Sequence, residues 1–515
     1  MRRFIAALLL GLIGACASLP TGYERTESHA LQDSASTALG LSSRDALRAH
    51  EGQSGCRPLP NGVDALAVRM VLAEKAERSL DVQYYIWHDD LTGRLFANAL
   101  LRAADRGVRV RILVDDVGTK TNDDTLLSLV AHPKIEIRLF NPVANRSFRG
   151  LGMLSDFSRT NRRMHNKAFV ADNQRAVLGG RNIGDVYFEV NDEVAFVDMD
   201  VVTYGPVVAE VSRAFDMFWN APMSIPIGAL TGRRGEAAGL DALRAALAAF
   251  AQAQRDNPYV VNARSQLAQG LAAGIDGVFW GKVHVLVDDP AKVSRAPEDT
   301  EGHLSQQLGR ITPHLRSELL IVSPYFVPGD AGVAGLRSLV AKGVRVTVLT
   351  NSLAATDVST VHAGYKQYRE ALLEAGVRLY ELKPSAIEFG KAKRGNRPTG
   401  GSRASLHAKT FVFDRSAVFI GSLNLDPRSV QLNTEIGVVC ENEALASALA
   451  GGLLAAIDQV AWRVERVVAS DGRTHLVWTE TTPSGVVQRQ DEPEVSTWRL
   501  LGVWFLGLLP IESQL

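Results

Sequence analysis

The sequence is poor in cysteine and has no excess of charge of either sign. Its 515 residues include three cysteines, Cys16, Cys56 and Cys440, whose spacing matches no metal-binding motif. The 56 Lys and Arg side chains balance the 56 Asp and Glu side chains, so the formal net charge is zero. A chain without net positive charge lacks the usual electrostatic signature of nucleic-acid binding. We therefore expect no metal site and no nucleic-acid partner.

The apolar run at the N-terminus is too short to span a bilayer. It covers residues 5–15, whereas a spanning helix needs about 20 residues. This predicts a secretory signal over residues 1–16. Residues 13–16 (Ile-Gly-Ala-Cys) resemble a bacterial lipobox, which implies lipidation of Cys16 and a lipid-anchored protein on the periplasmic side of a bacterial cell envelope. The alternative is that Cys16 is an incidental apolar residue of the signal, and inner and outer membrane both stay open.

Two cysteines remain beyond this signal. Cys440 lies in an apolar, strand-like run at 436–440, which is typical of a buried free thiol. We therefore expect free thiols. A disulfide between Cys56 and Cys440 is the alternative that an oxidising envelope allows.

The body of the chain contains an internal repeat. Residues 107–113 recur at 343–349 (343 − 107 = 236), and a second match is offset by 240 (378 − 138 = 240). In each half a strand-like segment, a helical segment and a second strand-like segment follow in order, which favours α/β domains with largely parallel sheets. The predicted division is a signal at 1–16, a tether and leading loop at 17–60, a first domain at 61–221, a helical connection at 222–275, a second domain at 276–465 and a C-terminal extension at 466–515.

Each half also carries the same polar cassette, H-x-K-x4-D, with Asn and Glu at matched distances. The two cassette histidines are offset by 242 (407 − 165 = 242), and in both halves Lys, Asp, Asn and Glu stand at positions +2, +7, +17 and +28 relative to His. The candidate catalytic residues are His165, Lys167, Asp172, Asn182 and Glu193 in the first half, and His407, Lys409, Asp414, Asn424 and Glu435 in the second.

The spacing of the cassette suits phosphoryl chemistry. In a strand, residues i and i+2 point to the same face, so we expect the His and Lys of each cassette to project together. An imidazole, an ammonium and an amide together can hold a phosphoryl group while a nucleophile attacks it. The alternative is an inherited but inactive duplication.

The paired cassettes resemble the HKD motifs of the phospholipase D superfamily, and the resemblance covers about residues 65–465. It implies two pseudo-symmetric α/β sandwich domains packed face to face, with one active site at their interface. It also implies a two-step mechanism through a phosphohistidine, without a metal or other cofactor.

The resemblance also implies roles for the candidates. His165 is expected to be the nucleophile and His407 the general acid and base, with Glu193 and Glu435 orienting the imidazoles. Substrate phosphate is expected to bind Lys167, Lys409, Asn182, Asn424 and Ser422, the last being a serine where the first half has Gly180. Asp172 and Asp414 are expected to support the fold more than the chemistry.

Several segments are similar to bacterial cardiolipin synthases, and most of all to the C-type group. They include residues 84–90, 162–167, 323–328 and 424–429. The resemblance implies transfer of a phosphatidyl group, with phosphatidylethanolamine as donor and phosphatidylglycerol as acceptor. Hydrolysis by a phospholipase D, a nuclease activity and a non-catalytic envelope binding protein are the alternatives. The sequence identifies no partner protein.

Two further features fit phospholipid substrates and a membrane surface. A basic segment precedes each cassette, and such a segment attracts anionic head groups. Residues 498–509 are apolar and too short to span, which suits either a helix at the membrane interface or one packed on the core. The basic residues are Arg146, Arg149, Arg159, Arg162 and Arg163 in the first half, and Lys391, Lys393, Arg394, Arg397 and Arg403 in the second.

Overall fold

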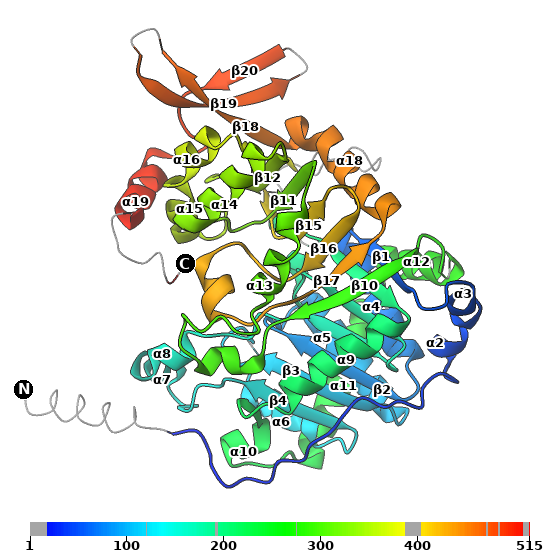
Figure 1. Cartoon of the computed structure of the whole chain (residues 1–515). Coiled ribbons are helices and arrows are strands. Elements are labelled where there is room, and N and C mark those ends of the chain that lie inside the picture. The colour runs from blue at the N-terminus through cyan, green and yellow to red at the C-terminus, as the bar shows by residue number, and fades with distance from the viewer. Residues whose placement is uncertain are drawn as a thin grey trace, which may run out of the picture.

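The fold is a duplicated α/β architecture in which two halves share one continuous sheet (Figure 1). The computed structural model describes residues 18–119, 121–190, 194–273, 275–386, 403–469, 472–482, 485–507 and 514. Within this part of the chain, an 18-stranded sheet runs through both halves. A separate two-stranded sheet joins β7 of the first half to β14 of the second.

The first half orders its strands β9-β4-β3-β2-β5-β6-β8-β1. The pairs β2–β3 and β3–β4 are parallel and the others antiparallel. The strands are β1 (Ser54–Leu59), β2 (Ser79–Tyr84), β3 (Arg109–Asp115), β4 (Ile135–Phe140), β5 (Ala168–Ala171), β6 (Arg175–Gly179), β7 (Val194–Val197), β8 (Asp200–Tyr204) and β9 (Ser224–Pro226).

The second half repeats this order in mirror image along the sheet. It runs β10-β17-β16-β15-β11-β12-β13 and continues through β18, β19 and β20. The strands are β10 (Phe279–Val287), β11 (Glu318–Val322), β12 (Arg345–Asn351), β13 (Arg378–Leu382), β14 (Arg403–Leu406), β15 (Lys409–Phe413), β16 (Ala417–Gly421), β17 (Ile436–Glu441), β18 (Ala461–Val468), β19 (Thr474–Thr482) and β20 (Gly485–Arg489).

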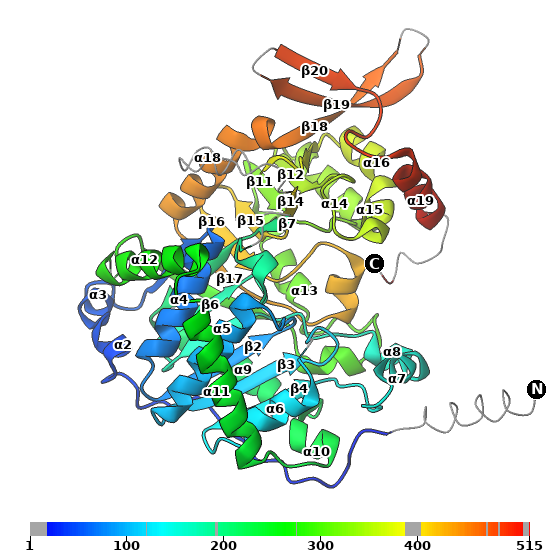
Figure 2. The same cartoon turned by 180° about the vertical axis from the view of Figure 1, so that it is seen from behind.

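The central strands are buried on both faces, as their apolar composition requires. Helix α5 (Leu91–Asp105) begins where the Asp90 carboxylate accepts from the Gly93 N–H, and it buries a stripe that includes Phe96 and Leu100. It packs beside α4 (Gly62–Lys75) and α11 (Ala237–Ala253) on one face of the first-half sheet (Figure 2). The other helices are α2 (Ala38–Leu41), α3 (Arg44–Ala49), α6 (Asp123–Val130), α7 (Arg149–Ser155), α8 (Phe157–Thr160), α9 (Pro206–Trp219), α10 (Ile227–Thr231), α12 (Pro258–Ala273), α13 (Leu304–Gly309), α14 (Gly329–Ala341), α15 (Ser359–Lys366), α16 (Arg369–Glu374), α18 (Glu443–Val460) and α19 (Thr497–Gly507).

A shared apolar core joins the two halves. It contains side chains from β5 and β6 of one half, such as Val170 and Leu178, and from β15 and β16 of the other, such as Val412 and Ile420. All four are buried, so the halves are packed together rather than tethered. Within the described chain, α18 alone is long and apolar enough to cross a membrane by length and composition, and it carries core residues such as Leu445 and Ala450.

Residues 17–60, which were predicted to be a tether and leading loop, contain the elements α2, α3 and β1, and parts of this segment pack on the first half. β1 forms the edge of that half and pairs with both β8 and β10. Upstream, the carbonyl of Ser28 accepts from the buried Arg111 guanidinium, 2.8 Å away. The predicted helical connection at 222–275 contains α10, α11 and α12, and it begins with β9, which pairs with β4.

Cys56 and Cys440 form a disulfide, so the expectation of free thiols was wrong. The reason is strand order, which the sequence does not reveal. β10 changes partner along its length, so that Phe279 pairs with Cys56 of β1 and Val283 pairs with Cys440 of β17. The two cysteines are 384 residues apart in sequence but adjacent in space.

Removing this disulfide should destabilise the protein without impairing catalysis. The Cys56→Ser/Cys440→Ser variant is expected to lose about 2–5 kcal/mol of unfolding free energy, because the cross-link restricts the unfolded chain. Its activity should stay within about twofold of the parent, since Cys440 is roughly 16 Å of strand from Glu435. Thermal melting with and without reductant measures the first effect. A melting midpoint that reductant leaves unchanged would contradict it.

Candidate active site

The two cassette histidines lie at the interface of the halves, and each is held by backbone of the other half. The His165 N–H donates to the Thr434 carbonyl at 2.9 Å, next to a parallel bridge between Met164 and Thr434. The His407 N–H donates to the Val197 carbonyl at 2.8 Å, at the end of the β7–β14 pairing. The position of each imidazole therefore depends on both halves.

Neither histidine lies on the strand that the cassette was expected to form. β5 begins at Ala168 and β15 begins at Lys409, so both histidines precede their strands. Each lysine turns back to its own cassette, where Lys167 Nζ donates to the His165 carbonyl at 2.6 Å and Lys409 Nζ donates to the His407 carbonyl. The histidines therefore lie just before the strands on which they were expected, and each lysine still acts electrostatically on the histidine of its own cassette.

A carboxylate from the opposite half contacts Nδ1 of each imidazole. Both carboxylate oxygens of Glu435 lie close to His165 Nδ1, at 2.9 and 3.0 Å. Asp198 Oδ2 lies 2.6 Å from His407 Nδ1. This leaves Nε2 of each ring free of these contacts, and it gives the arrangement in which a carboxylate fixes imidazole orientation and tautomer.

Asp198 is the carboxylate that sequence reasoning missed. Gly179 pairs with Asp200 in the first half and Gly421 pairs with Gly437 in the second, so Asp198 and Glu435 occupy equivalent positions. The first half has a short insertion before this point, since Asp198 stands at +33 from its cassette histidine (198 − 165 = 33) and Glu435 at +28 (435 − 407 = 28). Glu193 matched Glu435 only in its sequence offset of +28 from the cassette histidine, and it lies outside the described residues.

The residue that lies next to each orienting carboxylate differs between the halves: it is Gly180 beside Asp198, and Ser422 beside the longer side chain of Glu435. A side chain on Gly180 would meet Asp198 Oδ1 at 2.2 Å, so glycine makes room for this carboxylate. At the equivalent position, Ser422 Oγ donates to Glu435 Oε2 at 2.5 Å and accepts from the Ile436 N–H. Ser422 therefore contacts the orienting carboxylate, and its binding of substrate phosphate stays a prediction.

Burial and the two lysines dominate the electrostatics of the site. Burial lowers the pKa of His165 well below its usual value, and the Lys167 and Lys409 ammonium groups lower it further. Burial and then Lys409 lower the pKa of His407 to about 4, against the opposing effect of Asp198. Burial also lowers the pKa of Lys409 to about 8 and that of Lys167 well below its usual range. Because both lysines act on His165, the two cassettes form one electrostatic site.

The two orienting carboxylates are not equivalent. Burial raises the pKa of Glu435 to about 7, although Lys167 opposes this effect. Burial also acts to raise the pKa of Asp198, but the adjacent His407 outweighs it and the pKa falls to about 2. At neutral pH Asp198 is therefore fully ionised beside His407.

The two cassette asparagines are buried next to the site. Asn182 accepts from the Ile86 N–H through Oδ1 at 3.1 Å, and its side chain also interacts with the Tyr187 hydroxyl. Asn424 Nδ2 makes a long contact of 3.4 Å to Ser429 Oγ. Because an amide nitrogen carries two hydrogens, Asn182 can donate to Tyr187 and also to a phosphate oxygen.

The two cassette aspartates hold backbone and do not face the histidines. Asp172 accepts from the N–H groups of Glu77, Arg78 and Ser79, which lead into β2. Asp414 accepts from the equivalent N–H groups of residues 316–318, which lead into β11. They therefore position the strands and are not catalytic residues.

We expect Asp172→Ala to destabilise the protein more than Asp414→Ala. Asp172 is fully buried, and its loss leaves three N–H groups without an acceptor, at a cost of about 3–5 kcal/mol. Asp414 lies at an edge where Arg316 and Ser317 are exposed, so water can replace it at about 1–2 kcal/mol. Urea unfolding followed by circular dichroism gives the ranking. Equal destabilisation, or a larger effect at Asp414, would contradict the assignment.

A second pair of matched residues positions the backbone before each histidine. Asp115 Oδ2 accepts from the Met164 N–H at 3.0 Å, and Asn351 Oδ1 accepts from the Leu406 N–H at 2.8 Å. Asp115 and Asn351 end β3 and β12, and they share the offset of the strand repeat (351 − 115 = 236). Sequence reasoning missed both, although the strand repeat contained the signal.

Aromatic side chains line the histidines. The Tyr85 ring lies 5.1 Å from the His165 ring, edge to face, and the Tyr187 and Phe196 rings lie 5.3 and 4.9 Å from the His407 ring. These rings limit access of water to the imidazoles, which strengthens the electrostatic interactions.

The arginines of the basic segment before the first cassette already interact with carboxylates and backbone carbonyls of the protein. Arg146 and Arg149 pair with Asp123, with Arg146 also contacting Asp116, and Arg159 pairs with Asp156. The remaining two arginines, Arg162 and Arg163, donate to backbone carbonyls. In the second half, Arg403 donates to the Ala354 carbonyl, and Lys391, Lys393, Arg394 and Arg397 lie outside the described residues. The first segment is therefore not a free cationic patch for lipid head groups.

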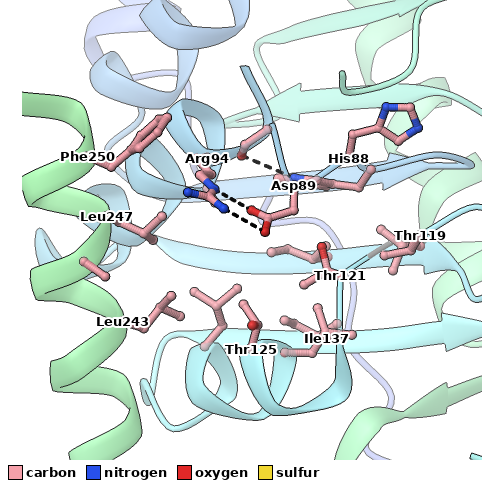
Figure 3. Close-up of a pocket in the computed structure, with 18 residues that line it drawn as sticks. His88, Asp89, Arg94, Thr119, Thr121, Thr125, Ile137, Leu243, Leu247 and Phe250 are labelled. Carbon is pink, nitrogen blue, oxygen red and sulfur yellow. Dashed lines mark hydrogen bonds and ion pairs between the residues drawn. The ribbon is translucent and has the colours of Figure 1, made fainter. Parts of the chain in front are cut away.

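A separate cavity of about 280 Å³ lies between α11 and the first-half sheet (Figure 3). Apolar side chains such as Leu243, Leu247 and Phe250 line one wall, and His88 and Asp89 lie at its polar end. The cavity contains neither cassette histidine, so it is distinct from the paired site. No cluster of His, Cys, Asp and Glu suited to a metal ion occurs among the residues that the structure places.

Two HKD cassettes sharing one site across a duplicated α/β fold define the phospholipase D superfamily. A family model described as "Cardiolipin synthase, PLD-like domain" matches residues 71–219 and 314–452, one match in each half. The chain therefore belongs to this family of phospholipase D-like cardiolipin synthase domains.

Individual relatives agree with this assignment. The chain is 44% identical over 465 residues to cardiolipin synthase C of Escherichia coli (strain K12), covering 90% of this chain and 96% of that protein. It is 27% identical over 410 residues to cardiolipin synthase A of Pseudomonas entomophila (strain L48), covering 78% of this chain and 67% of that protein. The crystal structure of phosphatidylserine synthase from Haemophilus influenzae Rd KW20 superposes with a TM-score of 0.55 at 14% identity, covering 82% of this chain and 91% of that chain, which supports the fold.

Proposed function

We propose that the protein is a phosphatidyltransferase that makes cardiolipin from phosphatidylglycerol and a second phospholipid, with phosphatidylethanolamine as the donor. The single observation that carries the chemistry is the pair of crossed contacts, His165 with Glu435 and His407 with Asp198. Two oriented imidazoles with free Nε2 atoms can supply a nucleophile and a general acid to one phosphorus. The 44% identity to a protein named cardiolipin synthase C supports cardiolipin as the product.

In the first step, His165 Nε2 attacks the phosphorus of the donor. The bond from phosphorus to the head-group oxygen breaks, and His407 Nε2–H gives its proton to that oxygen, so that ethanolamine leaves. In the second step, His407 takes the proton from a hydroxyl of phosphatidylglycerol. That oxygen attacks phosphorus, the phosphorus–nitrogen bond breaks, and cardiolipin leaves with His165 regenerated. Lys167, Lys409 and Asn182 hold the phosphate oxygens as charge develops.

His165 suits the nucleophile and His407 the acid because of their carboxylates. Asp198 is ionised and lies beside His407, where it favours an imidazolium. The charge of Glu435 is shared with Ser422 and Lys167, so it favours an imidazolium at His165 less. The bound phosphodiester adds a negative charge that promotes protonation of a nearby imidazole. That imidazole is His407, because its carboxylate partner, Asp198, is ionised.

Lipid product analysis tests the proposed function. Purified protein with phosphatidylethanolamine and radiolabelled phosphatidylglycerol in mixed micelles should release cardiolipin and ethanolamine in equal amounts. Phosphatidic acid in place of cardiolipin would assign the protein to hydrolysis. Cleavage of single-stranded DNA without lipid transfer would assign it to nuclease chemistry.

The protein is proposed to act in the bacterial cell envelope, anchored on the periplasmic side through a lipid on Cys16. The Cys56–Cys440 disulfide supports an oxidising compartment. In cells fed radiolabelled palmitate, the parent should carry label and sediment with membranes, whereas Cys16→Ser should carry none. Label that persists in Cys16→Ser would overturn this anchor.

A further inference from the structure

Two helical segments on one side of the molecule expose large apolar side chains to solvent. Phe148, Leu151, Leu154 and Phe157 belong to the α7–α8 segment and are 63%, 49%, 73% and 51% exposed. Trp498, Leu501, Trp504 and Phe505 belong to α19 and are 84%, 52%, 63% and 59% exposed. All five Phe and Trp side chains that are exposed in the described part of the chain lie in these two segments.

The exposed apolar face of α19 belongs to an anchored helix rather than to frayed chain. Val503 is buried against Leu353 and Ala363, and Arg499 donates to the Thr356 carbonyl, so one side of the helix is fixed on the second half. Trp498, Leu501 and Phe505 recur at helical spacing on the other side. A helix that is docked on one face and apolar on the other requires a second partner.

The two segments flank the same edge of the active site. Figures 1 and 2 place α19 and α7–α8 on the same side of the molecule, one on each half. Asn161, just after α8, contacts both Gln514 and Arg428 of the short helix η4 (Arg428–Leu432). Gly507 of α19 and Gln514 are seven positions apart in the sequence (514 − 507 = 7), which limits the distance between their Cα atoms to about 25 Å.

The chain that follows α8 connects this edge to the catalytic residues through hydrogen bonds between the two halves. The Arg163 N–H donates to Asn433 Oδ1 at 3.0 Å, and the Thr434 N–H donates to the Arg163 carbonyl at 3.0 Å. The next contact in the ladder is the one from the His165 N–H to Thr434. A surface that covers both segments would therefore meet the protein at the edge of the site.

We propose that α7–α8 and α19 together form a membrane-docking surface that inserts its apolar side chains into the bilayer interface beside the active site. The inference rests on the proposed function, because its occupant is the bilayer that holds the phospholipid substrates. Tryptophan and phenylalanine favour the interfacial region of a bilayer. Two exposed apolar segments on one side of the molecule suit a planar lipid surface, whereas a single protein partner would need to match both. Since the neighbouring arginines are already paired, docking depends on apolar insertion and not on charge.

Binding to vesicles of phosphatidylcholine alone tests this surface without any turnover. The protein used begins at residue 17, so it lacks both the predicted apolar signal at 1–16 and the proposed acyl anchor on Cys16. This protein should float with the vesicles, and raising NaCl from about 0.05 to about 0.5 M should change its partition coefficient less than twofold. Leu151→Ser/Leu154→Ser and Trp498→Ser/Trp504→Ser should each lower the partition coefficient about tenfold, and their combination should abolish binding.

The matched control is Val486→Ser/Val487→Ser, which changes exposed apolar side chains on β20, away from both segments. It should bind as the parent does. Quenching of tryptophan fluorescence by brominated phosphatidylcholine, in the protein that begins at residue 17, provides a measurement that needs no surface variant. Parent-like binding by the quadruple variant, or absence of quenching, would overturn the proposal. So would binding that requires anionic lipid and disappears with salt, or a dimer that the α19 substitutions dissociate. Cardiolipin formation in detergent micelles is scored separately, so failure of docking and failure of the proposed function give different results.

Discussion

Replacing His165 with alanine is expected to lower cardiolipin formation by at least about a thousandfold, because the chain then lacks the group that accepts the phosphatidyl moiety. His407→Ala should lower it by a similar factor with natural lipids, since the head-group alkoxide leaves poorly without a proton. The thermal midpoint of each variant should be measured alongside activity.

A donor with p-nitrophenol as its leaving group separates the two roles. This phenol leaves without protonation, so His407→Ala should still release a burst of nitrophenol close to one equivalent of enzyme. His165→Ala should release no burst. The matched control is His284→Ala on β10, an exposed histidine whose loss should leave activity unchanged. A burst from His165→Ala and none from His407→Ala would reverse the assignment.

Asp198→Asn is expected to lower activity by about a hundredfold to ten-thousandfold, by analogy with the loss of an orienting carboxylate from a catalytic triad. The negative charge of Asp198 raises the pKa of His407 against the effects of burial and Lys409. Removing that charge lowers the pKa of His407 further, so less of the acid is protonated at a given pH. The alkaline limb of the pH profile of kcat/KM should therefore move to lower pH.

Glu193→Gln is the control that shows whether the orienting carboxylate of the first half is Asp198, as the structure indicates, or Glu193, as the sequence offset predicted. Glu193 and Glu435 share the same offset from their cassette histidines, whereas Asp198 and Glu435 share a position beside a histidine. Glu193→Gln should keep activity within about threefold and leave the pH profile in place. A large loss at Glu193 with little effect at Asp198 would show that the spacing identified the functional carboxylate.

The repeat predicted the fold and most of the site because each cassette is a local pattern. Matched offsets located His165 and His407 and placed them in equivalent α/β halves, and the comparisons confirm the family and the fold. What the repeat could not predict depends on pairing between distant strands. Asp198 is displaced by a short insertion that only the β6–β8 register reveals.

The crossed nature of the site also required the structure. No local pattern indicates that Glu435 contacts the histidine of the first half, or that Thr434 and Val197 hold the two histidines by backbone. Likewise, the Cys56–Cys440 disulfide depends on β10 changing partner within the sheet. These features follow from how the halves pack, which the sequence of either half does not record.

The most direct test of the crossed two-histidine site is the identity of the residue that carries the phosphatidyl group. His407→Ala mixed with the p-nitrophenyl donor should accumulate the intermediate, because its second step lacks a base. Alkaline quenching preserves phosphohistidine, and peptide mass mapping then locates the adduct. One phosphatidyl group is expected, on the peptide that contains His165. An adduct on another residue, or a burst without any adduct, would contradict it.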